Sequence, residues 1–438
     1  MYDIIYIGGG LNYAGAVVAA KRGLKVALIE KDLQQLGGVC LHKGCIPSKM
    51  FLHHAQTLFE SHKDLFEGHI KLKLDKMVAK KEKLIQNATK AITAQCAKVD
   101  LIDGTAQVVS PNTVAIEEKL IEGKNIVIGT GSSPFIPEGI LYDQKAIITS
   151  DEVLKLTQLP KTIAVLGSGA IGLEMATYFA AQDVSVTLIV HHEKILKNAH
   201  PLIEQALRTQ LEKMGITILE NHHVLKAKDT YRGVHITFDD DHSRYFEMLL
   251  VATGRRPNTD VVATDKIEVQ KGIVTDDNFE TTLPAHYAIG DCNGKLQLAH
   301  AARAEVLFVT HKILGYNPEP INLDHVVKFI HTFPMSYATV GKNKVYFEKN
   351  NIPYKESIVP LSHFPLSSFY NANEGAVILY ADEEGFIAGG EIFAPNAEEL
   401  IAPVALALAG EMDMALAQKT IMAHPTFSEM VERAYFRL

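Results

Sequence analysis

Two segments of the chain share one pattern, and this repetition constrains the fold more than any other feature. Residues 3–32 read DIIYIGGGLNYAGAVVAAKRGLKVALIEKD, and residues 161–190 read KTIAVLGSGAIGLEMATYFAAQDVSVTLIV. Each predicts an apolar strand, a glycine turn, a helix and a second apolar strand, which begin a dinucleotide-binding βαβ unit. One such motif is a weak signal. Two of them, a domain apart, favour an α/β protein that binds two nucleotides side by side.

The glycine turns supply the first candidate cofactor-binding residues. In the first copy Gly8 and Gly10 fit the G-x-G-x-x-G pattern, but Tyr13 occupies the place of the third glycine. The second copy completes the pattern with Gly167, Gly169 and Gly172. Glycines permit a tight turn and let the backbone approach a pyrophosphate at a helix N-terminus. Because its pattern is incomplete, an ordinary glycine turn remains an alternative for the first copy taken alone.

The residues that end the two βαβ segments favour different nucleotides. The first segment ends on Glu30, which is suitably placed to accept hydrogen bonds from a ribose. The second ends on Val190, which is followed by His191, His192 and Lys197. These three side chains suit a 2′-phosphate, so the sequence favours NADPH over NADH. A solvated, charged loop is the open alternative.

The stretch GGVCLHKGCIPSK, residues 37–49, contains two of the four cysteines. Residues five apart on an ideal helix have Cα atoms roughly 8.5 Å apart, whereas a disulfide needs less than about 7 Å. A bridge between Cys40 and Cys45 therefore requires an irregular segment, with Gly44 and Pro47 as the expected helix breakers. A zinc site needs C-x-x-C pairs and a second ligand set, which the sequence lacks, so no metal is expected.

Composition and charge limit the partners of the chain. Its 438 residues are 47% hydrophobic and 21% charged, which is ordinary for a globular protein of two or three domains. With 43 Lys and Arg against 51 Asp and Glu, the net charge is −8. Nucleic acid and anionic membranes are therefore not expected as partners. The sequence holds no apolar run long enough to span a bilayer. Met1 leads directly into a strand-like segment, so we expect a cytoplasmic protein without a signal peptide.

Five motifs, in order along the chain, resemble those of the flavin-dependent pyridine nucleotide–disulfide oxidoreductases. They are GGVCLHKGCIPSK, GTGSSP (129–134), VATGRRPN (251–258), AIGDC (288–292) and AHPTFSE (423–429). The resemblance covers nearly the whole chain. It is strongest to the dihydrolipoamide dehydrogenases, with the glutathione reductases as cousins.

The resemblance implies an α/β fold with two Rossmann-like domains and a C-terminal α+β dimerisation domain. The predicted FAD domain comprises residues 1–148 and 263–318, the NAD(P) domain residues 149–262, and the dimer-interface domain residues 319–438. The implied cofactors are FAD and either NADH or NADPH. A homodimer is implied as well.

Individual cofactor contacts also follow from the resemblance. Gly8, Gly10 and Glu30 would hold the ADP half of FAD, and Asp291 would bond the ribityl chain. The FAD motifs also contribute Gly38, Thr130, Gly131 and Gly290. The nicotinamide nucleotide would be lined by Gly167, Gly169, Gly172 and Gly254. Lys49 would lie near the reactive flavin nitrogen and pair with Glu174.

The catalytic residues implied by the resemblance are two thiols and a base. Cys45 would contact the flavin as a thiolate, and Cys40 would attack the substrate disulfide. Attack requires a thiolate, so a base or cation must act on the thiol. His424 is the expected base, oriented by Glu429, and in the family this histidine reaches the disulfide of the other subunit.

Several positions depart from the family and leave the substrate open. Val190 replaces the usual carboxylate, Met335 replaces a usual Glu, and Met422 replaces a usual second His. A lipoamide-like disulfide or dithiol is the expected substrate, and a lipoyl-bearing complex is a candidate partner. The alternatives are an NADPH-dependent reductase of another small disulfide, as in glutathione reductase, or a flavin reductase of quinones or metals.

Overall fold

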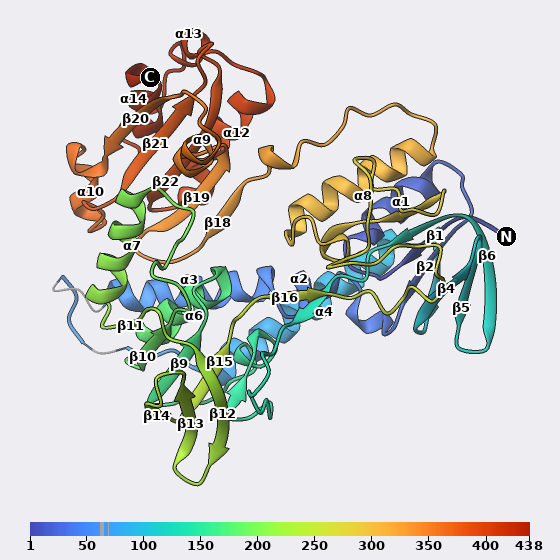
Figure 1. Ribbon diagram of the computed structural model, residues 1–438, viewed down its shortest axis with the longest axis horizontal. Coiled ribbons are helices and arrows are strands. Elements are labelled where there is room, and N and C mark those ends of the chain that lie inside the picture. The colour runs from blue at the N-terminus through green and yellow to red at the C-terminus, as the bar shows by residue number, and fades with distance from the viewer. Residues whose placement is uncertain (62–64, 69) are drawn as a thin grey trace. The chain divides into compact units, whose positions relative to one another are not determined.

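The protein is described by a computed structural model over residues 1–61, 65–68 and 70–438. The chain divides into two compact units. The first unit comprises residues 1–48, 75–135 and 255–323, and the second comprises residues 49–74, 136–254 and 324–438. Figure 1 labels the elements of both units.

The first unit is built on a seven-stranded sheet with the order β3-β2-β1-β6-β5-β4, in which β17 also pairs with β6. Its strands are β1 (Tyr2–Ile7), β2 (Val26–Glu30), β3 (Asp100–Asp103), β4 (Ala106–Ser110), β5 (Thr113–Ile116), β6 (Lys119–Ile128) and β17 (His286–Ala288). The strands β3, β2, β1, β6 and β17 run parallel, while β4, β5 and β6 form an antiparallel meander. Parallel strands are buried on both faces, which explains the nearly continuous apolar run in β1.

Helices cover one face of this sheet. They are α1 (Asn12–Lys21), α2 (Gly38–His42), α4 (Leu74–Gln95) and α8 (Ala299–Ile313). Ile4 and Tyr6 of β1 pack there with Ala16 of α1 and Val306 of α8. The alternate residues Ile5 and Ile7 pack on the opposite face against β4 and β5. A two-stranded ribbon of β7 (Ser132–Pro134) and β16 (Arg255–Pro257) also belongs to this unit.

The second unit contains a parallel sheet with the order β11-β10-β9-β15-β8 and a smaller antiparallel sheet, β12-β13-β14. The strands are β8 (Ile147–Ile148), β9 (Thr162–Leu166), β10 (Ser185–Ile189), β11 (Thr217–Leu219), β12 (Val224–Thr230), β13 (Gly233–Phe238), β14 (Ser243–Phe246) and β15 (Met248–Val251). The accompanying helices are α5 (Ser150–Val153), α6 (Ala170–Ala180) and α7 (Pro201–Lys213). Most of α3 (Cys45–Ser61) also belongs to this unit.

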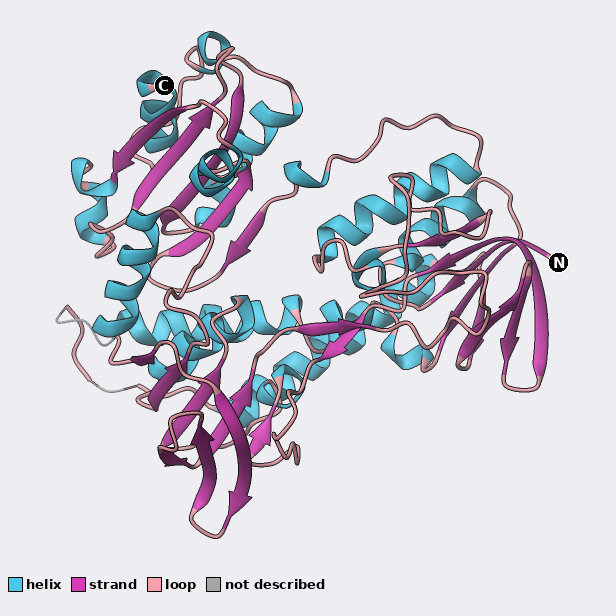
Figure 2. Ribbon diagram, viewed as in Figure 1, coloured by secondary structure: helices cyan, strands magenta, loops and turns pink. Residues whose placement is uncertain are grey.

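The C-terminal part of the second unit is an antiparallel sheet with the order β18-β19-β22-β21-β20 (Figure 2). Its strands are β18 (Lys328–Ile330), β19 (Ser336–Gly341), β20 (Lys355–Pro360), β21 (Ala376–Ala381) and β22 (Ile387–Ala394). Its helices are α9 (Lys344–Asn350), α10 (Leu366–Phe369), α11 (Ala397–Leu400), α12 (Ala402–Ala409), α13 (Met414–Ala417) and α14 (Ser428–Arg437). Short 3₁₀ helices elsewhere in the chain span Leu33–Gln35, Gly290–Asn293, Leu323–His325 and Leu361–His363.

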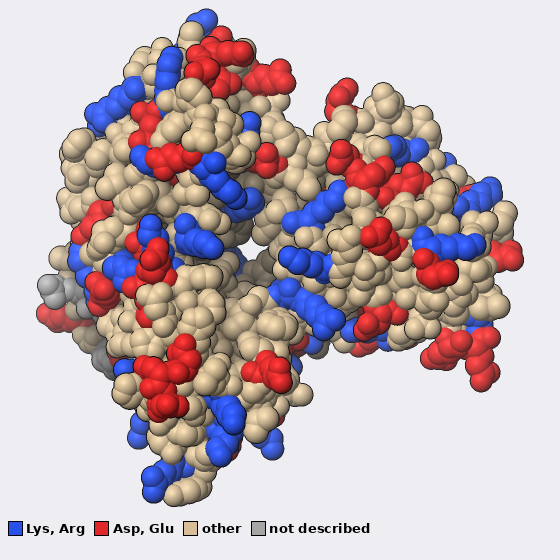
Figure 3. All heavy atoms as spheres, viewed as in Figure 1, with Lys and Arg blue, Asp and Glu red and all other residues tan. Residues whose placement is uncertain are grey.

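The architecture confirms the predicted fold class, with two parallel nucleotide-binding-type sheets and a C-terminal α+β portion. The domain boundaries predicted at residues 148, 262 and 318 stay predictions. On the face shown in Figure 3, Lys and Arg side chains are interspersed with Asp and Glu side chains. Within the described ranges, no helix combines the length and apolarity needed to cross a membrane.

Candidate functional site

The glycine turn after β1 packs tightly against a second pair of glycines. The amide of Gly37 donates to the carbonyl of Gly9, at 2.9 Å. A Cβ on Gly38 would stand 2.8 Å from the Cα of Gly10, so only glycine fits where these two backbones meet. The Glu30 carboxylate, at the end of β2, accepts the amide of Gly9 at 2.5 Å. The predicted FAD-binding residues Gly8, Gly10, Gly38 and Glu30 therefore lie together around one backbone turn.

Tyr13 does not disrupt this turn, because a hydrogen bond from the neighbouring Asn12 holds α1 to the end of β1. Asn12 is buried at the first position of α1, and its Nδ2 donates to the carbonyl of Ile7 at 3.0 Å. The close approach of α1 to α8 depends on Gly15, where a Cβ would stand 2.5 Å from Oγ1 of Thr310. The helix therefore packs closely through Gly15 rather than through a third glycine in the turn.

A polar network joins the GTGSSP, RRPN and GDC segments within the first unit. The Ser132 hydroxyl donates to Asp291 at 2.5 Å. Nε of Arg255 lies 2.7 Å from the Ser132 hydroxyl, and its Nη2 donates to the Ser132 carbonyl at 2.6 Å. Thr130 donates to the carbonyl of Asn258 at 2.7 Å. The predicted residues Thr130 and Asp291 are thus brought together, and Gly131 joins them by accepting the amide of Asn258.

Glu305 supports this network by a hydrogen bond to the backbone of Gly290. It is buried in α8, where its Oε2 accepts the amide of Gly290 at 2.7 Å and Nδ2 of Asn293 at 3.0 Å. Burial raises the pKa of this carboxyl group. The sequence analysis did not predict Glu305, because a lone Glu inside a helix carries no local signal.

The cysteine pair spans a break between two helices. α2 ends at His42 and α3 begins at Cys45, so the interruption falls at Lys43 and Gly44. This break confirms the predicted irregularity at Gly44. Pro47 was wrongly expected to break the helix, because it lies in the first turn of α3, where a proline needs no amide hydrogen.

The two sulfurs contact each other across this break. Both cysteines are thiols here, with Cys40 half-buried and Cys45 exposed. The Cys40 side chain hydrogen-bonds with Cys45, and this bond together with burial holds the pKa of the Cys40 thiol far above its usual range. The amides of Cys45 and Ile46, at the start of α3, point at the Cys40 sulfur. Cys40 is therefore protonated in the dithiol state and needs a base to become a nucleophile.

Lys49 lies one helical turn after Cys45 and has a carboxylate partner that the sequence did not predict. It forms an ion pair with Glu398 of α11, and its Nζ lies 2.8 Å from Nδ1 of His331. Glu174, the partner expected from the resemblance, instead accepts the backbone amide of His331 at 2.9 Å. Burial raises the pKa of Glu174. The expected direct pair between Lys49 and Glu174 is thus replaced by an arrangement in which Glu174 lies behind His331.

The second glycine turn has the geometry of a complete nucleotide-binding motif. A Cβ on Gly172 would stand 1.9 Å from the carbonyl oxygen of Gly167, so the third glycine allows α6 to pack against the turn. Gly169 faces open space, with no heavy atom within 4 Å of an added Cβ, and the same holds for Gly254. Open space beside two glycines is what close approach of a nucleotide requires.

Histidines gather where β10 ends. The rings of His191 and His192 have centroids 4.9 Å apart, and His223 places its ring 3.8 Å from that of His191. Burial and then the two neighbouring imidazoles lower the pKa of His191. Lys197 is exposed in the same loop. The sequence analysis named His191, His192 and Lys197 but gave His223 no role, because it lies more than thirty residues away on the segment before β12.

The C-terminal motif places a base beside a carboxylate. Nδ1 of His424 lies 3.1 and 3.0 Å from the two oxygens of Glu429, which lies in the first turn of α14. The hydrogen bond from His424 lowers the pKa of Glu429. His424 is exposed, with 75% of its side chain accessible. With Nδ1 facing the Glu429 carboxylate, Nε2 is the ring nitrogen that remains to act as a base.

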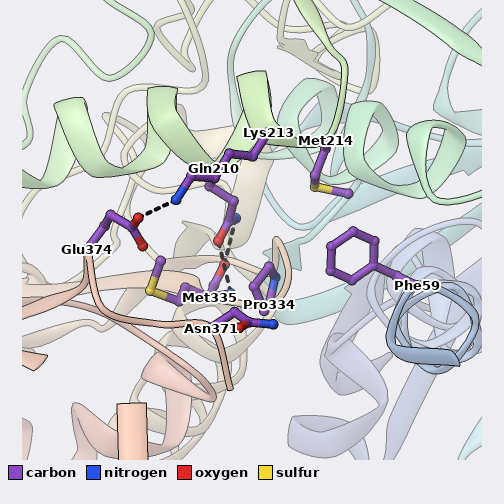
Figure 4. Close-up of a pocket in the computed structure, with 8 residues that line it drawn as sticks. All are labelled: Phe59, Gln210, Lys213, Met214, Pro334, Met335, Asn371 and Glu374. Atoms are coloured by element: carbon purple, nitrogen blue, oxygen red, sulfur yellow. Dashed lines mark hydrogen bonds and ion pairs between the residues drawn. The ribbon is translucent and has the colours of Figure 1, made fainter. Parts of the chain in front are cut away.

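One cavity of the second unit is lined by none of the predicted catalytic residues. It has a volume of about 340 Å³ and is lined by Phe59, Gln210, Lys213, Met214, Pro334, Met335, Asn371 and Glu374 (Figure 4). Gln210 bonds both the amide and the carbonyl of Met335, at 3.1 Å each. The departure from Glu at this position therefore gives the cavity an apolar wall and leaves the predicted catalytic residues untouched. Among the residues that the structure describes, no group of His, Cys, Asp and Glu is arranged to hold a metal ion.

We expect Gly38→Ala to weaken FAD binding by about tenfold or more, because the new methyl group meets the Gly10 backbone. The left-handed φ of +64° adds a cost of roughly 1–2 kcal/mol. FAD release during gel filtration, followed by flavin absorbance, measures the effect. The matched control is Gly23→Ala, which has a φ of +89° but no heavy atom within 4 Å of the added Cβ. Equal FAD retention in both variants would contradict the role of the first glycine turn.

Comparison with known proteins places these features in a family context. Residues 2–305 match the family described as pyridine nucleotide-disulphide oxidoreductase, and residues 327–435 match the dimerisation domain of the same name. A dihydrolipoyl dehydrogenase of Chlamydia muridarum is 31% identical over 446 residues, which cover 98% of this chain and 95% of that protein. A leghemoglobin reductase of Vigna unguiculata is 32% identical over 456 residues, covering 99% of this chain and 86% of that protein.

The fold itself has close structural neighbours. The crystal structure of LpdA from Mycobacterium tuberculosis superposes with a TM-score of 0.91 and covers 100% of this chain and 99% of that one. Its sequence identity is 24%, so this likeness concerns the fold.

Proposed function

We propose, because the chain belongs to the pyridine nucleotide-disulphide oxidoreductase family, that its Cys40–Cys45 pair exchanges electrons with a small disulfide or dithiol. The chain is an oxidoreductase with FAD and a nicotinamide nucleotide as cofactors. The observation that carries the proposal is the contact between the two thiols across the break before α3. Two sulfurs held in contact can form and break a disulfide without rebuilding the fold.

The residues around the first glycine turn fit FAD. The Gly10 backbone leaves no room for a side chain at Gly38, and Glu30 lies beside the turn as a ribose-binding carboxylate would. Gly8, Gly10, Gly38 and Glu30 would hold the ADP half. Thr130, Gly131, Gly290 and Asp291 would hold the remainder. When bound, FAD supplies a two-electron carrier between the hydride of NAD(P)H and the cysteine pair.

The side chains of the protein carry out the thiol exchange. In the reducing direction, His424 takes the proton of Cys40, and the Cys40 sulfur attacks one sulfur of the substrate disulfide. The substrate S–S bond breaks, a disulfide forms between Cys40 and the substrate, and the leaving thiolate takes the proton from His424. The Cys45 thiolate then attacks the Cys40 sulfur and releases the second substrate thiolate, which takes a proton from solvent. The Cys40–Cys45 disulfide is restored, and the substrate has gained two electrons.

We propose a homodimer in which His424 of each chain serves the cysteines of the other. The matched dimerisation domain and the exposure of His424 support this arrangement. Glu429 keeps the proton on Nδ1, so that Nε2 acts as the base.

Dihydrolipoamide is the substrate that we propose first. The name of the Chlamydia muridarum relative supports it, and a lipoyl-bearing complex would then be the physiological partner. The test is turnover of the purified protein with lipoamide and with glutathione disulfide, each with NADH and with NADPH. Activity with lipoamide is the expected result. Activity with glutathione disulfide alone would favour a reductase of another small disulfide, as in glutathione reductase. Activity with neither compound would contradict both substrate assignments.

We also propose that the chain prefers NADPH, with His191, His192 and Lys197 at the 2′-phosphate. We expect Lys197→Ala to weaken NADPH binding about tenfold, since a charge-assisted hydrogen bond is worth roughly 1.5–3 kcal/mol. NADH binding should be unchanged, because NADH has no 2′-phosphate. Nucleotide titration followed by flavin reduction measures both. Lys194→Ala, an exposed lysine in the same loop, is the matched control.

The lowered pKa of His191 adds a pH dependence with a definite sign. The free imidazole favours its neutral form, whereas a phosphate favours the protonated form, so NADPH binding takes up a proton. Because the pKa of free His191 lies below the ordinary histidine value, NADPH affinity should rise as the pH falls towards and below about 6.5. NADH affinity should stay constant. Equal pH dependence of the two nucleotides would contradict the assignment.

A further inference from the structure

Lys49 meets three side chains from three other parts of the second unit. Lys49 comes from α3, Glu398 from α11, Glu174 from α6, and His331 from the segment between β18 and β19. Lys49 pairs with Oε1 of Glu398, and both groups contact Nδ1 of His331, at 2.8 Å from Nζ and 2.7 Å from Oε1. The ammonium, the imidazole and the carboxylate therefore form a closed triangle of polar atoms.

In two members of the triangle, Glu398 and His331, the side chain is largely buried, and the third, Lys49, is exposed to solvent. The side chains of Glu398 and His331 are only 9% and 8% exposed, whereas that of Lys49 is 49% exposed. The Ser336 hydroxyl donates to Oε2 of Glu398 at 2.6 Å, and the amide of Ala397 donates to that hydroxyl at 2.9 Å. Contacts with His331 and Ser336 thus fix both carboxylate oxygens of Glu398 independently of Lys49.

The hydrogen bonds also determine the charge of Glu398. Burial alone would raise its pKa, but hydrogen bonds from His331, Lys49 and Ser336 hold the pKa of Glu398 far below its usual range. Glu174, by contrast, has its pKa raised by burial, although the nearby charge of Lys49 acts to lower it. Of the two carboxylates that face this cluster, Glu398 therefore carries the stable negative charge.

We propose that Glu398 and His331 are positioning residues that hold Lys49 and balance its charge in the electron transfer between flavin and disulfide. The inference rests on the proposed function. Lys49 follows Cys45 by four residues on α3, and side chains at this spacing share one face of a helix. The charge balance at Nζ therefore acts on the Cys45 thiolate and on any group that contacts both side chains. Glu174 supports the cluster by fixing the backbone of His331.

The first experiment measures the hold on Lys49 directly. Purified holoenzyme at pH 8 is treated with a trace of an acylating reagent, and labelling of each lysine is read by peptide mass spectrometry. Lys49 in Glu398→Gln should react about tenfold faster than in the wild type, because the amine loses a charge-assisted hydrogen bond. Glu398→Asp should restore slow labelling. The matched control is Glu399→Gln, which removes the same charge from the exposed next residue of α11.

The second experiment tests the role in electron transfer. The long-wavelength absorption of a thiolate in contact with flavin is titrated against pH in the NADPH-reduced variants. Removing the negative charge of Glu398 stabilises the thiolate, so the midpoint of the band should fall by about one pH unit, a tenfold change in proton affinity. Glu399→Gln should keep the wild-type midpoint.

The outcomes separate this inference from the proposed function. Unchanged labelling of Lys49 in Glu398→Gln, or faster labelling only in Glu174→Gln, would overturn the inference. Faster labelling of Lys49 without a shift in the pH midpoint of the long-wavelength band would show an ion pair that does not affect the thiolate. That result would overturn the proposed role of Glu398 in electron transfer. A wild type that lacks the band would overturn the proposed function, and with it the role of Lys49 in electron transfer.

Discussion

We expect Cys40→Ser to lower disulfide turnover by about a thousandfold or more, which is the scale of effect when a covalent nucleophile is removed. A hydroxyl group cannot form the mixed disulfide, and at neutral pH it supplies almost no anion. Reduction of the bound flavin by the nicotinamide nucleotide should continue at its original rate, because that step precedes the thiol exchange. Steady-state turnover with lipoamide and stopped-flow reduction of the flavin measure the two steps separately.

A second cysteine provides the control for this variant. Cys96 is buried in the first unit, away from Cys40 and Cys45 in the sequence, and Cys96→Ala should retain full turnover. Unchanged turnover in Cys40→Ser would exclude the dithiol mechanism. The remaining interpretation would then be a flavin reductase of quinones or metals, which needs no cysteine pair.

His424→Gln should lower disulfide turnover by about a hundredfold to ten-thousandfold, the usual contribution of a general base. The Cys40 thiol has a strongly raised pKa, so loss of the base leaves almost no thiolate at neutral pH. Flavin reduction should be unaffected. The limb of the pH–rate profile that belongs to the histidine should disappear as well, and glutamine, which does not titrate, cannot restore it.

Two further variants, His363→Gln and Glu429→Gln, are compared with His424→Gln. His363→Gln changes an exposed histidine of the same unit and should have no effect. Glu429→Gln should cost less than His424→Gln, because the base remains but its orientation is lost. The lowered pKa of Glu429 means that its anionic partnership with His424 is present above about pH 4.5 and is lost only as the pH falls through the depressed value. A pH profile of Glu429→Gln that matched the wild type between pH 5 and 9 would contradict the orienting role.

The sequence was sufficient for features that depend on neighbouring residues. The glycine turn with Gly167 and Gly172 was predicted because a strand, a turn and a helix lie within one short segment. The interruption at Gly44 followed from simple helix geometry, although Pro47 was misjudged because proline is compatible with the first turn of a helix. The roles of the predicted site residues stay predictions until the variants are measured.

The partners that lie far apart in the chain were not predictable in the same way. Glu398 follows Lys49 by 349 residues and His331 follows it by 282, and no spacing rule links such positions. Their contact depends on how α3, α11 and the segment before β19 pack in the second unit. Glu305 presents the same difficulty, because its role beneath Gly290 becomes visible only when α8 is placed on the sheet.

The central claim is that the flavin and the Cys40–Cys45 pair share electrons, and anaerobic reduction of the purified protein tests it most directly. NADH and NADPH are added separately in stoichiometric amounts while the visible spectrum is recorded. The account predicts a long-wavelength band from the Cys45 thiolate in contact with flavin, formed faster with NADPH than with NADH. Bleaching of the flavin without this band, in the presence of both cysteines, would contradict the account.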